Sequence, residues 1–312
     1  MAYRLPPLST FRTFESAARH LSFTKAAEEL HVTPSAVSQQ IKTLEDWLDC
    51  RLFHRRQNLL QLTEEGLAMC SRVREGLDCF AAAVAATRHD TAPALNVTAP
   101  PSFATRWLVP RLSRFSSAHP AVAIRVTSTV DNIDRPQAAS GPKSALIDLR
   151  DDEGEVAIRF GSGFYPGYEV EKILTPDFVV VCNPRLLSGA SPLRTPADLS
   201  QHILIHDESI PSAGKVPIWS AWLKLAGAEG IDSERGPRFS NTLLVIEAVL
   251  EGQGVALVPR LLVDADVAAG RLSLPFAIRL PSEYSYYLVV PGALAAREPV
   301  AAFRAWLQTE AA

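Results

Sequence analysis

The sequence lacks the features that mark several classes of protein. Its four cysteines, Cys50, Cys70, Cys79 and Cys182, form no Cys-x-x-Cys pair, which argues against a disulfide-stapled secreted module and against a cysteine-rich zinc site. No apolar run approaches the ~20 residues of a membrane span. The N-terminal residues also contain no continuous apolar core of the kind found in signal peptides. We therefore expect a soluble, cytoplasmic protein of a reducing compartment.

Charge of one sign is not in excess either. The chain has 31 lysines and arginines against 34 aspartates and glutamates, a net charge of −3. Any nucleic-acid binding must therefore come from a local surface and not from the global charge. The seven histidines are scattered, and neither a Gly-x-Ser-x-Gly motif nor a Walker-type loop is present. The sequence predicts no metal site and no cofactor.

Glycine and proline are scarce in only one part of the chain. A length of 312 residues predicts two compact units at ~150 residues per domain, with room for a small third. Between Leu8 and Arg88 the only glycines and prolines are Pro34, Gly66 and Gly76, which predicts nearly continuous helix. After Pro93 both residue types recur between short β-branched runs, so strands alternate with helices. We expect two small α/β lobes there, with parallel sheets and crossover connections.

Residues 22–45 carry the strongest functional signal. Ser22 precedes a short helical run as an N-cap, His31 and Val32 form a turn, and Thr33 precedes Pro34 as the cap of a second helix. A short helix, a tight turn and a second helix form a helix-turn-helix unit. Its second helix begins with small polar residues, as a helix that reads the major groove of DNA requires.

The candidate DNA contacts follow from this placement. Gln39 has the amide that pairs with an adenine edge, and Thr33 and Ser35 are suited to phosphate oxygens near a helix N-terminus. The alternative is an ordinary helical hairpin with solvated polar residues. The predicted contacts are Ser22, Thr24, Lys25, Thr33, Pro34, Ser35, Ser38, Gln39, Lys42, Arg55 and Arg56.

The pattern of residues in this region resembles LysR-type transcriptional regulators. The resemblance rests on Ala26, Ala27, Leu30, the run 33–38, Ile41, Leu44, Glu45, Leu52, Phe53 and the run 62–66. Four later segments, 103–115, 155–167, 193–199 and 247–259, look like the subgroup of glycine-cleavage and β-lactamase regulators. The resemblance covers nearly the whole chain.

This resemblance implies an α/β protein with an all-α N-terminal part. It implies a winged helix-turn-helix over residues 1–62, a linker and dimerisation helix over 63–90, and a two-lobed effector domain like a periplasmic binding protein over 91–312. It implies a regulator and not an enzyme. The implied partners are double-stranded DNA with a pseudo-palindromic site, a small-molecule effector such as an amino acid, peptide or carboxylate, and further copies of the chain in a homodimer or homotetramer. RNA polymerase is a further candidate partner.

The chain departs from the family pattern at three places. Asp49 stands where the turn after the recognition helix usually has glycine, so we expect Asp49 at positive φ. Gln57 and Asn58 replace a further arginine in the wing, which predicts a weaker or altered contact with the minor groove. Residues 134–144 form an extra polar loop to which the sequence assigns no role.

The linker helix is predicted to need a partner. A helix of ~25 residues is ~37 Å long and cannot bury its apolar stripe alone. A second copy of the same helix is the simplest cover, and a dimer would then present two recognition helices. The alternative is that this helix packs on its own effector domain.

Candidate effector contacts lie at strand ends and helix starts, where open α/β lobes bind ligands. The resemblance places Ser102, Thr242 and Tyr286 where the β-lactamase regulators contact their ligand. Ser102 is also a predicted N-cap, and Arg159 suits a carboxylate, with a structural bridge between the lobes as its alternative. The complete set is Ser102, Phe103, Thr127, Ser128, Arg159, Phe160, His206, Thr242 and Tyr286.

One alternative function belongs to a different class. A stand-alone solute-binding protein or small enzyme with a helical N-terminal extension would share the two α/β lobes. It would bind no DNA at physiological salt and would lose nothing when residues 1–90 are deleted.

Overall fold

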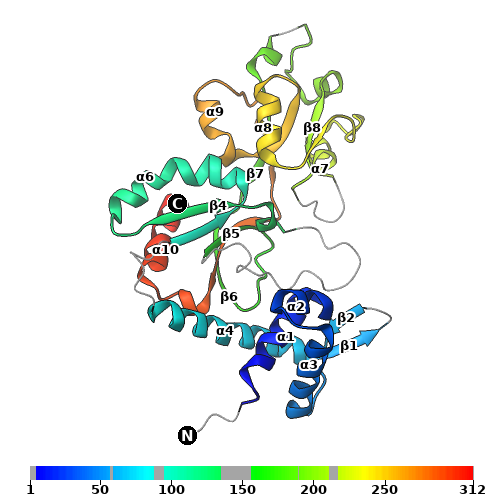
Figure 1. The fold of residues 1–312 in the computed structure, drawn as a ribbon. Helices are drawn as coiled ribbons and strands as arrows, with labels where there is room; N and C mark the ends of the chain where they lie inside the picture. Colours follow the sequence, from blue (N-terminus) through cyan, green and yellow to red (C-terminus); the bar gives the residue numbers. More distant parts are fainter. Residues whose placement is uncertain are drawn as a thin grey trace.

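The structure, a computed structural model, describes residues 5–56, 59–87, 95–134, 156–188, 190–210 and 217–311. These residues form a helical N-terminal part, one long helix and two α/β lobes (Figure 1). Gln57, Asn58 and all of the extra loop except Asp134 lie outside the described residues. None of the helices in the described ranges is long and apolar enough to cross a bilayer.

Three helices and a β-ribbon form the N-terminal part. Apolar side chains three or four residues apart share one face of each helix, and Phe14, Val37, Ile41 and Leu44 are buried in one common core. The elements are α1 (Leu8–His20), α2 (Phe23–Leu30), α3 (Pro34–Leu48), β1 (Phe53–Arg56), β2 (Leu59–Leu62) and the long helix α4 (Glu64–Thr87).

Local capping sets the ends of these helices as predicted. The side chain of Ser22 accepts from Lys25 N, that of Thr33 accepts from Ala36 N with Pro34 following, and that of Thr63 accepts from Gly66 N at 2.9 Å. Asp49 ends α3 at φ 53°, which confirms the expected positive φ. The turn between α2 and α3 therefore follows from the local sequence.

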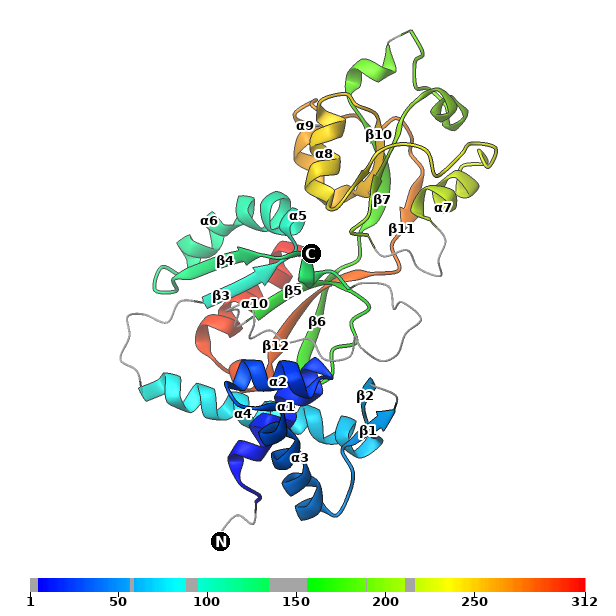
Figure 2. The same ribbon diagram turned by 45° about the vertical axis from the view of Figure 1, so that its right-hand side comes forward.

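Two five-stranded sheets form the effector region. Lobe 1 has the strand order β4-β3-β5-β12-β6 and lobe 2 the order β11-β7-β10-β8-β9. Figure 2 shows lobe 2 above lobe 1, with the chain running between the lobes from the lower ends of β7 and β11. Phe115 of α6 packs edge-on against Phe303 of α10 in lobe 1, and α8 packs on the sheet of lobe 2.

Lobe 1 contains β3 (Leu95–Ala99), α5 (Pro101–Phe103), the π-helical turn η1 (Ala104–Leu108), α6 (Val109–Ala118), β4 (Ile124–Ser128), η2 (Val130–Asn132), β5 (Val156–Gly161), β6 (Tyr168–Leu174), β12 (Ser285–Pro291), η7 (Gly292–Leu294) and α10 (Glu298–Ala311). Lobe 2 contains β7 (Asp177–Cys182), η3 (Pro184–Leu187), η4 (Pro196–Gln201), β8 (Leu204–Asp207), α7 (Ile218–Leu225), β9 (Arg238–Phe239), α8 (Thr242–Leu250), β10 (Val255–Pro259), η6 (Arg260–Leu262), α9 (Asp264–Ala268) and β11 (Arg279–Pro281).

The expectation of purely parallel sheets is wrong. β3 pairs in parallel with β4 and β5, and β10 with β8, but β7, β11 and β12 run antiparallel to their neighbours. The reason is that β7 and β12 are the strands that continue across from the other lobe, so each enters its sheet from the opposite end. The sheets are mixed, as is common in doubly wound folds.

The expected N-cap at Ser102 is also wrong. The helical run begins at Pro101, one residue earlier, and Pro100 is its N-cap without a side-chain hydrogen bond. Proline at the first helical position suits this start, because its missing N–H is one that a helix leaves unpaired. The hydroxyl of Ser102 therefore has no capping role.

Two adjacent chain segments connect the lobes. Residues 175–176 lead from β6 to β7, and residues 282–284 lead from β11 back to β12. The N–H of Ser282 donates to the carbonyl of Pro176 at 3.1 Å, and the hydroxyls of Thr175 and Ser285 lie 2.6 Å apart. These bonds hold the two segments together at the hinge.

Helix α4 packs on its own lobe 1 as well as on the N-terminal core. The guanidinium of Arg74 lies 5.8 Å above the ring of Tyr168 and also pairs with Glu15 of α1 at 3.4 Å. A side chain on Gly167, which has φ 86°, would approach Ser71 to 3.3 Å. One face of α4 thus connects the N-terminal part to lobe 1.

Candidate nucleic-acid interface and effector cleft

Helix α3 has one buried face and one exposed polar face. Val37, Ile41 and Leu44 point into the N-terminal core. Ser35, Gln39 and Lys42 follow at steps of four and three residues on the other side, and they and Thr43 are exposed. A helix with this division presents a continuous polar strip to a partner.

The exposed strip begins at the N-terminus of α3. Thr33, Pro34 and Ser35 are exposed there, and the Thr33 hydroxyl accepts from Ala36 N at 3.2 Å while it lies 2.9 Å from the hydroxyl of Ser35. Among the other predicted DNA contacts, Thr24 and Lys25 of α2 are exposed, and Ser22 and Ser38 are half-buried. The predicted DNA contacts of α2 and α3 are therefore exposed or half-buried, and their joint role stays a prediction.

Glu45 is a positioning residue that the sequence analysis did not single out. Its carboxylate is 6% exposed and accepts from the N–H groups of Leu52 and Phe53 at 2.8 and 3.3 Å, and Arg51 donates to it at 2.9 Å. These bonds tie the C-terminal end of α3 to the first strand of the wing. The sequence held one signal for this role, because Glu45 follows the buried Ile41 by four residues and so lies on the inward face of α3.

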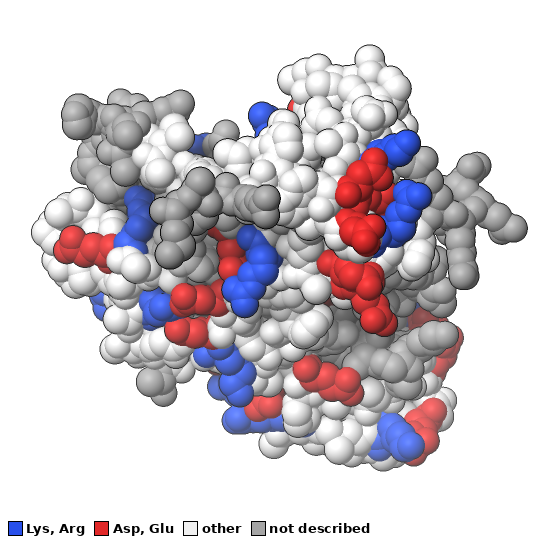
Figure 3. All heavy atoms as spheres, turned by 90° about the horizontal axis from the view of Figure 1, so that it is seen from below, with Lys and Arg blue, Asp and Glu red and all other residues white. Residues whose placement is uncertain are grey.

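The wing is a two-stranded antiparallel ribbon whose cations come from β1. Arg55 pairs with Leu60 and Arg56 with Leu59 in the ladder, and the side chains of both arginines lie outside those that the structure describes. On the face seen from below in Figure 3, the visible cationic and anionic side chains alternate. This face therefore shows no extended surface of one charge sign, so any binding of a polyanion there would depend on local contacts.

The lobe 1 side of the effector cleft is aromatic. Phe103 stacks on Trp107 at 4.8 Å and on Tyr286 at 4.4 Å, and Tyr286 meets Phe160 at 4.8 Å between ring centroids. Ser102 precedes Phe103 and is 5% exposed. Four of the predicted effector residues therefore come together beside the hinge.

The lobe 2 side of the cleft is polar. Thr242, the first residue of α8, is buried and its hydroxyl donates to Asp207 Oδ2 at 2.5 Å. Asp207 ends β8, and Ser209 donates to its other oxygen. Burial raises the pKa of Asp207 despite these bonds, and burial together with the Asp207 carboxylate raises the pKa of Tyr286 above its ordinary value.

The Asp207 carboxylate of lobe 2 is therefore near enough to Tyr286 of lobe 1 to affect its ionisation. The sequence analysis placed His206 here and passed over its neighbour, although the rule that ligands bind at the carboxyl ends of strands points to both residues.

The remaining predicted effector residues have other surroundings. Thr127 is half-buried and Ser128 is exposed, both at the end of β4. The guanidinium of Arg159 donates to Asn132 Oδ1, to the carbonyl of Asp131 and to Asp134 Oδ1 at 3.1, 2.8 and 3.2 Å. Arg159 is thus engaged within lobe 1 and forms no bridge between the lobes in these bonds.

His206 supports the fold of lobe 2 through its ring. Its Nε2 donates to the carbonyl of Arg235 at 2.9 Å. His202 stands four residues before it, a spacing that places two ligands on one face of a helix, but His206 lies in a strand. In the part of the chain that the structure describes, no group of three or more histidines, cysteines or acids is placed to hold a metal ion.

An arginine of lobe 1 holds lobe 2 across the cleft. Arg106 in η1 donates to Asp266 Oδ2 at 2.5 Å and to Glu247 Oε1 at 2.8 Å. Asp266 is 1% exposed and also accepts from Arg271. The sequence could not indicate these pairs, because the partners of Arg106 lie 160 and 141 residues away along the chain.

The apolar side chains of α4 are buried near the middle of the helix and exposed toward its C-terminal end. Cys70 and Val73 are buried in the N-terminal core and Leu77 is half-buried, whereas Phe80 is 53% and Val84 is 55% exposed. Exposed large apolar side chains in a row on one helix are typical of a protein interface.

Two family descriptions match the chain. Residues 8–67 match the bacterial regulatory helix-turn-helix protein of the lysR family, and residues 88–312 match the LysR substrate binding domain. The first covers α1 to the start of α4, and the second covers both lobes.

Named relatives are similar over nearly the full length. The chain is 42% identical to the glycine cleavage system transcriptional activator of Escherichia coli K12, over all of this chain and 96% of that protein. It is 34% identical to the HTH-type transcriptional activator AmpR of Pseudomonas aeruginosa, over 98% of this chain and 96% of that one. These likenesses do not favour a stand-alone solute-binding protein or an enzyme.

Solved structures share the fold. The effector domain of AmpR from P. aeruginosa superposes with a TM-score of 0.57 at 27% identity, over 70% of this chain and 95% of that one. CrgA from Neisseria meningitidis, described as a LysR-type transcriptional regulator, superposes with a TM-score of 0.54 at 21% identity, over 97% of this chain and 98% of that one. LysR-type regulators bind DNA and small-molecule effectors and form oligomers. The chain belongs to this family and is a transcriptional regulator with an N-terminal DNA-binding helix-turn-helix and a C-terminal effector-binding domain.

Proposed function

We propose that α3 enters the major groove with its N-terminal end leading and that Gln39 reads a base. The observation that carries this proposal is the exposed polar strip of α3 opposite its buried apolar face. Thr33, Ser35 and Lys42 would contact phosphates, which fix the register of the helix without reading sequence. In cells the protein would work in the cytoplasm, where bacterial DNA lies.

The wing would add contacts with the backbone and the minor groove. Arg55 and Arg56 are the cations of the ribbon, and the next two residues in the sequence, Gln57 and Asn58, carry no charge. The proposed interface would be completed by further contacts from α2 and α3, namely Ser22, Thr24, Lys25, Pro34 and Ser38. Alanine at Arg55 should weaken binding to all duplexes, whereas alanine at Gln39 should relax the preference at particular bases.

The domain division supports a paired protein. We assign DNA binding to residues 1–62, dimerisation to 63–90 and effector binding to 91–312. A second copy of α4 would cover Phe80 and Val84, which lie beyond the N-terminal core. Two α3 helices would then face a pseudo-palindromic site, as a homodimer or as a pair of dimers in a homotetramer.

The effector would bind between the lobes. We expect Ser102, Thr242 and Tyr286 to contact it together with Phe103 and Phe160. Further predicted contacts lie in or at the ends of β4, β5 and β8, namely Thr127, Ser128, Arg159 and His206. Asp207 adds a carboxylate to the lobe 2 wall. An amino acid or a small peptide would pair its ammonium group with the Asp207 carboxylate. An effector that carries a carboxylate would pair it with Arg159.

The regulatory step would be a shift between two lobe arrangements. A ligand changes such an equilibrium only by its differential affinity for the two states. The change would alter the spacing of the half-sites or the bend of the DNA, and through these the contact with RNA polymerase.

Genome-wide footprinting of the bound sites tests this function and names candidate effectors through the neighbouring genes. The proposal expects paired half-sites in register with a two-fold dimer. Footprints of constant length in the presence of any tight-binding ligand would refute the proposed shift, and binding without preferred sites would refute the reading by α3.

A further inference from the structure

A pocket outside the interlobe cleft lies beside strand β7 in lobe 2. Its volume is about 310 Å³, and it is lined by Val179, Arg260, Leu274, Pro275, Phe276, Ala277 and Arg279. This volume is at the lower end of the range of small-molecule sites. None of the lining residues belongs to the proposed effector cleft.

The pocket exists because one segment is too long for the strand that it accompanies. Ser273 pairs with Cys182 through two backbone hydrogen bonds, and Arg279 pairs with Val179 in the antiparallel ladder. Between these anchors, the five residues 274–278 lie opposite only two, 180 and 181. Residues 274–278 therefore bend away from β7 and leave a space over the strand.

The segment 274–278 packs against helix α7 on the side away from β7. The ring of Phe276 packs against Trp222 of α7 at 5.5 Å, and the indole of Trp222 donates to the carbonyl of Ile278 at 3.5 Å. Phe276 is 8% exposed. The pocket is therefore a formed feature of the lobe.

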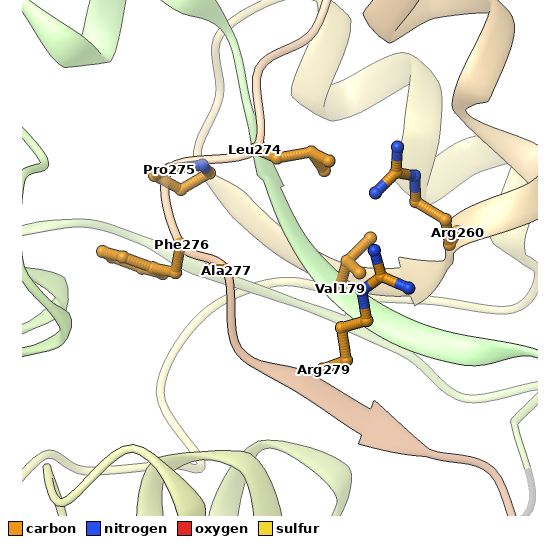
Figure 4. Close-up of a pocket in the computed structure, with 7 residues that line it drawn as sticks. All are labelled: Val179, Arg260, Leu274, Pro275, Phe276, Ala277 and Arg279. Atoms are coloured by element: carbon orange, nitrogen blue, oxygen red, sulfur yellow. The ribbon is translucent and has the colours of Figure 1, made fainter.

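Two arginines from different elements face the pocket. Figure 4 shows the guanidinium groups of Arg260 and Arg279 converging near Val179, with the side chain of Leu274 directed toward Arg260. Arg260 pairs through Nε with Asp264 at 2.6 Å, and the closest contact between Arg279 and Asp177 is 3.8 Å. Such exposed pairs contribute little and leave terminal nitrogens of both arginines for another anion.

We propose that this pocket binds a small organic carboxylate, with the carboxylate between Arg260 and Arg279 and an apolar body on Val179 and Leu274. Arginine forks match a carboxylate in geometry as well as charge. The apolar floor selects an organic anion over phosphate or chloride, which would leave Val179 and Leu274 uncovered.

A ligand at this site would influence the equilibrium between the two lobe arrangements, because both arginines begin elements that lead to the other lobe. Arg260 begins η6, which packs against η1 of lobe 1. Arg279 begins β11, which continues through residues 282–284 into β12 and Tyr286. An anion that bridges the two arginines joins the two elements of lobe 2 that lead to the cleft.

Isothermal titration of the full-length protein with benzoate, and with benzamide as the neutral isostere, tests the proposal. We expect one benzoate per chain and at least about tenfold weaker binding of benzamide, the factor that one charge-assisted hydrogen bond supplies. Arg260→Gln and Arg279→Gln should each weaken benzoate about tenfold. The matched control is Arg238→Gln, because Arg238 is an exposed arginine at the opposite edge of the same sheet with its own i,i+4 ion pair to Glu234.

Hydrogen exchange locates the site independently of the variants. Benzoate should protect amides in residues 272–281. Equal affinity for benzoate and benzamide, no binding of benzoate, or weakening by the Arg238 variant as large as by the others would overturn the proposal. Protection confined to residues 99–104 and 204–209 would also overturn it, because benzoate would then occupy the interlobe cleft.

Discussion

Replacing Arg106 with glutamine should loosen the contact between the two lobes. Arg106 reaches from η1 of lobe 1 to Asp266 and Glu247 of lobe 2. Asp266 is 1% exposed, so water cannot replace the lost guanidinium easily. Arg271 remains as a partner of the Asp266 carboxylate after the substitution.

These contacts set the expected size of the effect. Leaving a buried charge with no partner costs about 3–5 kcal/mol. Because Arg271 stays, the loss is reduced to that of one charge-assisted hydrogen bond, about 1.5–3 kcal/mol. The side chain of Glu247 is 62% exposed, so its ion pair with Arg106 adds at most about 1 kcal/mol. We expect a net loss of about 2 kcal/mol, or roughly 30-fold in the equilibrium between closed and separated lobes.

Spin-label distance measurements between the lobes would detect this shift. In a Cys79→Ser background, which removes an exposed cysteine, labels at the exposed positions Ser116 of lobe 1 and Gln253 of lobe 2 report the separation. Arg304→Gln is the matched control, since Arg304 is similarly buried and has two carboxylate partners, Glu169 and Glu171, both within lobe 1. The reasoning is refuted if the Arg106 variant gives the same distance distribution as the wild type or as the control.

Three further predictions concern other parts of the chain. Glu45→Ala should lower the free energy of unfolding by about 2–4 kcal/mol, because two buried N–H groups lose their acceptor, while Glu45→Gln retains an acceptor and should lose less; equal losses in urea titrations would contradict this role. The raised pKa of Asp207 means that the folded state holds this proton to higher pH than the unfolded state does. The contribution of Asp207 to stability therefore falls as pH rises above about 4. Asp207→Asn should flatten this dependence of the free energy of unfolding on pH, and an unchanged dependence would count against the burial argument. A thiol reagent should label the exposed Cys79 faster than Cys182, because burial raises the pKa of Cys182 to about 11. Mass spectrometry would follow the labelling of the native protein, and equal rates at the two cysteines would contradict the fold around β7.

Local chemistry made the N-terminal part predictable. The caps at Ser22, Thr33 and Thr63 and the positive φ of Asp49 follow from neighbouring residues, and all are present in the structure. The strand and helix positions of the lobes followed from apolar runs and their spacing. The sequence did not predict β9, β11 and α9, because two, three and five residues are too few for a hydrophobic period to show.

Features that depend on distant parts of the chain could not be read from the sequence. The antiparallel direction of β12 depends on the return of the chain across the hinge after ~100 residues in lobe 2. The partners of Arg106, Arg159 and Asp207 depend on that same path, since spacing along one sequence does not identify which acid meets which base. Asp207 was overlooked for this reason.

The most direct measurement of the central claim is the affinity of the full-length protein for a bound genomic site and for duplexes with each base pair changed in turn. The account predicts two symmetric sets of sensitive positions about one helical turn apart, at which Gln39→Ala loses discrimination while Lys42→Ala weakens all duplexes alike. Equal affinity for every duplex, or a single set of sensitive positions that the Gln39 variant leaves unchanged, would contradict it.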